Sequence, residues 1–100
     1  MWPWRKPANG TSGRLAFPNQ SRSYDATLRA VRFWAYDRSM ENIFVVTSDA
    51  LRRMEPNLQA DEASALRAFD RNRERIFRIA SKIYARGGRR ASYNLVAAYF

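Results

Sequence analysis

The segment from about residue 60 to Gly87-Gly88 constrains the fold most, because its apolar side chains recur with the period of an α-helix. Placed at about 100° per residue, they share one arc of the helix, which must be buried against another element. The glycine pair offers the left-handed backbone that ends many helices. We therefore predict one long amphipathic helix over residues 60–86. Its core-facing side chains are Leu66, Phe69, Ile76, Phe77, Ile79, Ala80, Ile83 and Tyr84.

Residues 30–36 alternate between two faces, and residues 41–47 are rich in β-branched and aromatic types. The polar break at residues 37–40 has the length of a hairpin turn. These segments predict an antiparallel hairpin that packs on the long helix. The side chains expected to face that helix are Val31, Phe33, Ile43 and Val45.

A short helix is predicted between the Thr47-Ser48 cap and Pro56, and residues 93–97 read as a last strand. Residues 15–17 or 24–27 can add an edge piece. The predicted fold is α+β: a small antiparallel sheet, made of the hairpin and a C-terminal strand, covered on one face by the short helix and the long amphipathic helix. One hundred residues suffice for one core, which we place in a single domain over residues 21–100.

Residues 1–20 are rich in proline and glycine and have no apolar period, so they are expected to form a flexible tail. Trp2 and Trp4 stand in this tail with no role that the sequence assigns. No apolar run approaches the roughly 20 residues that span a bilayer. The expected location is cytoplasmic, with no membrane contact.

The chain contains no cysteine and no histidine, which excludes thiolate nucleophiles, Cys/His zinc sites and the common catalytic triads. Its nine acidic residues are mostly isolated in the sequence. Asp61 and Glu62 are adjacent, but they fall where a helix should begin and suit its positive end. We therefore expect no metal site, no cofactor and no enzymatic activity.

The formal charge of +9 is concentrated, because residues 71–90 hold eight basic residues and one acid and so carry +7 of it. The basic residues of the long helix fall on one side of the wheel and continue beyond its end. Such a ridge can be a solvated face, with Glu74 and Arg78 as a helical ion pair, or a site for a polyanion such as nucleic acid, bound without sequence preference. The candidate polyanion-binding residues are Arg67, Arg71, Arg75, Arg78, Lys82, Arg86, Arg89 and Arg90.

The second face of the hairpin offers an aromatic and basic set: Arg32, Trp34, Tyr36 and Phe44. Unpaired bases could stack on it. Alternatively, the set is an interaction face buried against a protein partner or a second copy of the chain, because a small sheet has edges and a face to cover. The sequence leaves nucleic-acid binding and homodimerisation as competing hypotheses.

Arg73 departs from the pattern, because the wheel places it inside the apolar arc of the long helix. A guanidinium cannot be buried there without compensation. It must extend to solvent, form an ion pair with Asp70 or an acid of the hairpin, or bind a ligand in a cleft.

Several of these segments together resemble the bacterial domain-of-unknown-function family 1488 over residues 15–100. The matching stretches are Tyr24-Asp25, Val31-Arg-Phe-Trp34, Ser48-Asp-Ala-Leu51, Phe69-Asp-Arg-Asn-Arg73-Glu-Arg-Ile76 with Ala80 and Tyr84, and Tyr93-Asn-Leu95. The resemblance implies a small α+β fold with the same element order, and it implies no activity. The chain departs from the family in its tryptophan-bearing extension, in a hairpin turn without glycine and in its ending, Ala98-Tyr99-Phe100.

Overall fold

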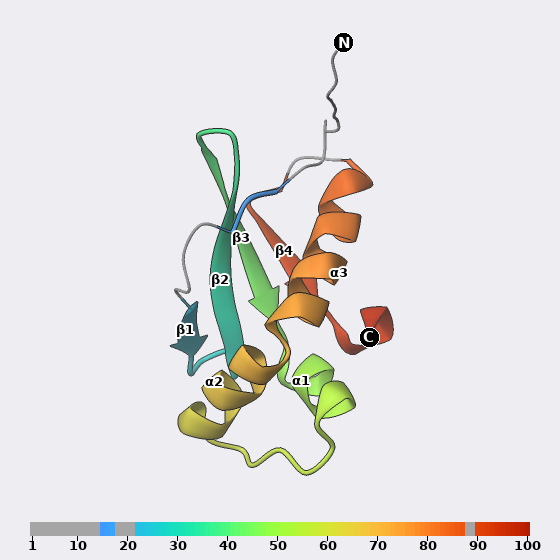
Figure 1. The fold of residues 1–100 in the computed structure, drawn as a ribbon. Helices are drawn as coiled ribbons and strands as arrows, with labels where there is room; N and C mark the ends of the chain where they lie inside the picture. The colour runs from blue at the N-terminus through green and yellow to red at the C-terminus, as the bar shows by residue number, and fades with distance from the viewer. Residues whose placement is uncertain (1–14, 18–21, 88–89) are drawn as a thin grey trace.

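The computed structural model describes residues 15–17, 22–87 and 90–100. Its elements in chain order are β1 (Arg22–Asp25), β2 (Ala30–Asp37), β3 (Met40–Val46), α1 (Ser48–Met54), α2 (Glu62–Arg71), α3 (Arg73–Ala85), β4 (Ser92–Leu95) and the 3₁₀ turn η1 (Ala97–Tyr99). The three α-helices lie on one side of a four-stranded sheet (Figure 1). This arrangement confirms the predicted α+β fold, with the helices covering one face.

The strands lie in the order β1-β2-β3-β4. β1 pairs with β2 and β2 with β3 in antiparallel fashion, whereas β3 and β4 run parallel. The sheet is therefore mixed, which corrects the prediction of a sheet that is antiparallel throughout. The reason is the long connection through the helices, which returns the chain to the end of the sheet where β3 began.

The hairpin turn consists of Arg38 and Ser39 alone, with Arg38 at a φ of 61°. This two-residue turn pairs Asp37 with Met40 and places Phe33 opposite Phe44. Residues opposite each other share a face, so Phe44 lies on the helix-covered side and is fully buried.

This register corrects two expectations about β3. Phe44 belongs to the core, and so does Val46. Phe44 is therefore not part of the face that carries Trp34 and Tyr36, which we call the open aromatic face. Ile43 and Val45, expected in the core, pair with Trp34 and Arg32 on the opposite face. A shift of one residue in strand pairing exchanges the two faces, and the position of the turn decides it.

Contacts between aromatic rings connect the sheet to the helices that cover it. The ring of Phe33 lies 5.3 Å from Phe44, 5.2 Å from Phe69 of α2 and 5.5 Å from Phe77 of α3. Phe17 stacks on Phe77 at 4.1 Å, and Ala16 forms an antiparallel bridge with Tyr36, so residues 15–17 lie at the edge of the sheet as the edge-piece alternative expected. The rest of the predicted tail, with Trp2 and Trp4, lies outside the described residues.

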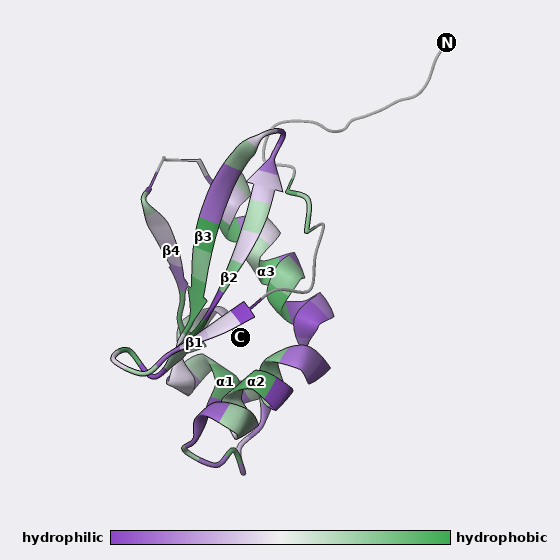
Figure 2. Cartoon of the chain, turned by 90° about the vertical axis from the view of Figure 1, so that its left-hand side faces the viewer, coloured by the Kyte–Doolittle hydropathy of each residue, from purple (hydrophilic) through white to green (hydrophobic). Residues whose placement is uncertain are grey.

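The predicted long helix is two helices, separated at Asn72. The side-chain nitrogen Nδ2 of Asn72 donates to the backbone oxygen of Ala68 at 2.8 Å and to Oε2 of Glu55 at 2.9 Å. Asparagine side chains compete in this way with backbone hydrogen bonding, which makes them poor interior helix residues. Figure 2 shows the hydrophilic band where α2 gives way to α3.

We expect Phe69→Ala to lower the free energy of unfolding by about 3–5 kcal/mol, because it leaves a cavity among the rings of Phe33 and Phe77. Urea denaturation measures this change. Leu28→Ala is the control, since Leu28 is 57% exposed and its removal should cost under about 0.5 kcal/mol. Equal effects of the two substitutions would contradict the core described above.

Candidate functional site

The structure divides the arginines by their partners. Among the described residues, five arginines form ion pairs with carboxylates at N–O distances of 2.9 Å or less. These are Arg22 and Arg73 with Asp70, Arg32 with Asp25, Arg52 with Asp49, and Arg71 with Glu55. Asp25, Asp49 and Glu55 each balance one arginine, whereas Asp70 is shared by Arg22 and Arg73. The remaining cations are the first candidates for binding an anion.

Arg73, the basic residue in the apolar arc, is explained by such a pair. Its Nη2 lies 2.8 Å from Oδ1 of Asp70, its guanidinium lies 5.0 Å from the centre of the Phe69 ring, and its side chain is 16% exposed. Burial opposes ionisation of Asp70, but hydrogen bonds from Arg22 and Arg73 outweigh it and lower the Asp70 pKa. Arg73 is therefore a structural ion-pair residue, one of the three roles considered for it.

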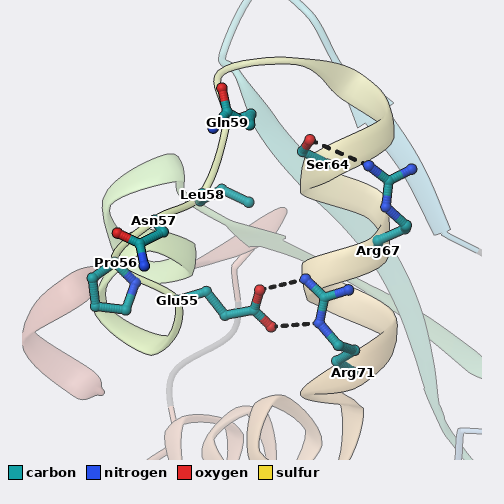
Figure 3. A pocket seen from close by; sticks show the side chains of 8 residues that line it. All are labelled: Glu55, Pro56, Asn57, Leu58, Gln59, Ser64, Arg67 and Arg71. Carbon is teal, nitrogen blue, oxygen red and sulfur yellow. Dashed lines mark hydrogen bonds and ion pairs between the residues drawn. The ribbon is translucent and has the colours of Figure 1, made fainter.

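Arg71 is held by Glu55, which follows α1. Its Nε donates to Oε2 of Glu55 at 2.9 Å, and its Nη2 donates to Oε1 (Figure 3). The hydrogen bond from Arg71 is the main reason that the Glu55 pKa is lowered, and the same bond raises the Arg71 pKa. Arg71 thus has a carboxylate partner, and 57% of its side chain remains exposed.

Four cations lie along one side of α3, and we call them the α3 stripe: Arg75, Arg78, Lys82 and Arg86. Within the part of the chain that the structure describes, none of the four forms an ion pair. The helical pair expected between Glu74 and Arg78 is likewise not formed. The stripe therefore keeps its positive charge.

Two aromatic residues of the C-terminal segment flank this stripe. Nη2 of Arg75 donates to the backbone oxygen of Phe100 at 3.0 Å and its guanidinium lies 5.9 Å from that ring. Arg86 lies 5.8 Å from the ring of Tyr99, which is 40% exposed. Sequence reasoning missed these aromatics, because nothing local to residues 99 and 100 indicates a contact with a helix. The two rings hold the arginines in place and carry no charge of their own.

The other candidate cations are dispersed. Arg90 is exposed and lines a small hollow with Arg86 and Tyr99, so it extends the stripe. Arg67 lies on α2 beside Arg71, away from the stripe. Arg89 lies outside the described residues. The predicted ridge is thus shortened to α3 and Arg90.

The open aromatic face lies on the side of the sheet away from α3 (Figures 1 and 2). Arg32 is paired there with Asp25, the hydroxyl of Tyr36 donates to Glu41 at 3.1 Å, and Trp34 is half-buried. Val45 is 5% exposed. A ligand on the α3 stripe therefore cannot stack on Trp34 or Tyr36 at the same time.

A cleft of about 350 Å³ lies between α2 and the loop that follows α1. The Glu55–Arg71 pair forms one of its walls, and Arg67 lines it from α2 (Figure 3). Nη2 of Arg67 lies 3.4 Å from Oγ of Ser64. The residues lining the cleft are Glu55, Pro56, Asn57, Leu58, Gln59, Ser64, Arg67 and Arg71.

Two features are absent from the described residues. No helix there has the length and apolarity needed to cross a bilayer. No group of three acidic side chains in the described part of the chain could hold a metal ion.

Comparisons with known proteins agree on one family. The sequence profile of the family described as "Protein of unknown function (DUF1488)" matches residues 15–96. A crystal structure of a protein of unknown function from the same family, from Shewanella loihica, superimposes with a TM-score of 0.74. The two chains are 19% identical, and the match covers 86% of this chain and 96% of the other, which establishes a common fold. No curated protein matches the chain.

The Glu55–Arg71 pair should make stability depend on pH. Because the Glu55 pKa is lower in the folded state, the pair stabilises the protein above the ordinary glutamate pKa, and this contribution is lost as the pH falls below that pKa and through the lowered one. We expect Glu55→Gln and Arg71→Gln each to flatten this part of the profile, measured by urea denaturation at stepwise pH. The double variant should resemble either single variant, and additive effects would show that the two side chains act independently.

Proposed function

The chain belongs to the DUF1488 family of proteins of unknown function, and from the distribution of its charges we propose that it is a non-catalytic module that binds the phosphate backbone of nucleic acid through the α3 stripe. The proposal rests mainly on one observation. Five arginines elsewhere are each paired with a carboxylate, whereas the cations of the stripe share one helix side and have no such partner among the described residues.

The spacing of the stripe suits a line of phosphates. Arg75 and Arg86 are eleven residues apart, which is about 16 Å of helix at 1.5 Å per residue. Phosphates of one DNA strand advance about 3.4 Å per nucleotide along the duplex axis, so a few of them fit beside the stripe. Contacts of this kind position a nucleic acid and provide affinity without reading its sequence.

The aromatic contacts of Arg75 and Arg86 support the proposal. Both guanidiniums lie over exposed or half-buried rings of Tyr99 and Phe100, which restricts their motion before any ligand binds. A partly ordered arginine loses less conformational entropy when it contacts a phosphate. Tyr99 also offers a ring surface next to the stripe on which a base of a single strand can stack.

Self-association through the open sheet face is the alternative function, and it has weaker support. Its polar members are satisfied within the chain, by the Arg32–Asp25 and Tyr36–Glu41 contacts. The large hydrophobic side chains that the structure exposes are elsewhere: Leu28, Met40, Val96 and Tyr99. The face therefore offers less free apolar surface than a strong interface requires.

Binding to a short DNA should weaken steeply with salt. Neutralising four phosphates predicts a slope of log K against log salt of roughly −3.6 for a duplex and −2.8 for a single strand. Fluorescence anisotropy with labelled oligonucleotides at several salt concentrations measures the slope. Replacing both Arg78 and Lys82 by glutamate should reduce its magnitude by about 1.8 for a duplex and about 1.4 for a single strand.

The matched control replaces Arg29 and Arg38 by glutamate, which alters the net charge equally at the turns on either side of β2. This variant should keep a slope near that of the wild type. Equal losses in both double variants would mean that only net charge matters, and no binding at low salt would refute the proposed function.

A further inference from the structure

The cleft beside α2 is distinct from the α3 stripe. Its walls are α2 and residues 55–59, and its volume of about 350 Å³ falls in the range of small-molecule sites, roughly 300–1,000 Å³. Ser64 at its edge is buried, whereas Arg67 and Arg71 of the same wall are exposed to solvent and to a ligand that enters. A polymer backbone runs along a surface, whereas this cleft suits a compact ligand.

The charges of the cleft do not cancel. Its lining contains Arg67, Arg71 and Glu55, which sum to +1. Glu55 already accepts hydrogen bonds from two nitrogens of Arg71 and from Asn72. Its carboxylate is therefore committed and cannot neutralise Arg67 as well.

Arg67 is the cation of the cleft whose charge Glu55 does not neutralise. Its contact with Ser64 Oγ, at 3.4 Å, is long for a hydrogen bond. Asp61 is an acid within electrostatic reach, and the charge of Arg67 contributes to its lowered pKa. The main cause of that shift is the backbone N–H of Ser64, and Asp61 forms no ion pair with Arg67 among the described residues.

We propose that this cleft binds a small molecule carrying a carboxylate or phosphate group, with Arg67 as the residue that receives the anion. The planar fork of a guanidinium matches two oxygens of either group. Asn57 and Gln59 also line the cleft, where their amides can donate to or accept from the rest of the ligand, and Pro56 and Leu58 offer it apolar contact.

The probes are sodium phosphate and sodium acetate, added separately to the full-length ¹⁵N-labelled protein at constant ionic strength and constant pH. We expect saturable chemical-shift changes at the backbone amides of residues 57–59 and 64–67. A stronger response to phosphate identifies a phosphorylated ligand class, and a response to acetate that equals or exceeds it identifies carboxylates. Shifts that grow linearly without saturation, for both anions, would overturn the proposal.

Variants separate Arg67 from general charge effects. Arg67→Gln should weaken binding of the responding anion about tenfold or more, and Arg67→Lys should weaken it less, because the charge stays while the fork is lost. Arg38→Gln, with the same loss of charge at the hairpin turn, should bind as the wild type does. Equal weakening by Arg67→Gln and Arg38→Gln would refute the role of Arg67.

The glutamate double variant of Arg78 and Lys82 makes this test independent of the proposed nucleic-acid function. Neither residue lines the cleft, so the variant should retain the saturable shifts at residues 57–59 and 64–67 even though its DNA binding is reduced. Loss of anion binding in this variant would place the anion on the α3 stripe and overturn the cleft site.

Discussion

The hydrogen bonds of Asn72 are the constraint on which the arrangement of charges depends. Its amide joins the end of α2 to Glu55, so the helical stretch breaks there and Glu55 is brought against Arg71. In an unbroken helix, Arg67 and Arg71 would continue the line of α3 cations. At the break, Arg67 and Arg71 instead line the cleft beside the loop after α1, while Arg71 also borders a hollow that Arg75 and Arg78 line.

The aromatic core gives α3 its fixed orientation. Phe77 packs against Phe17 and Phe33, and the hydroxyl of Tyr84 donates to Asp37 at the end of β2 at 2.7 Å. The Tyr84 pKa is raised, chiefly by this bond. Phe77 and Tyr84 fix one side of α3 against the sheet, so the basic side faces outward. Tyr99 and Phe100 lie beside the arginines of that basic side.

The sequence allowed a correct prediction of features that depend on a repeated spacing of residues. It did not allow the prediction of features that depend on a single turn or a single long-range contact. The apolar spacing of Phe69, Ile76 and Ala80 was enough to predict a core-facing stripe. The turn at Arg38 contains no glycine, so its positive φ and the resulting register of β3 had no local signal. The Glu55–Arg71 contact spans 16 positions and depends on the helix break, which the continuing apolar period concealed.

The central claim is that the ion pairs decide which arginines can bind a polyanion. The most direct measurement compares two single variants that remove the same charge, Arg71→Gln and Arg78→Gln, by the salt dependence of their DNA affinity. If the account is correct, Arg78→Gln reduces the magnitude of the slope by about 0.7–0.9, while Arg71→Gln leaves it unchanged because Glu55 already holds that guanidinium. Equal reductions in both variants would contradict it.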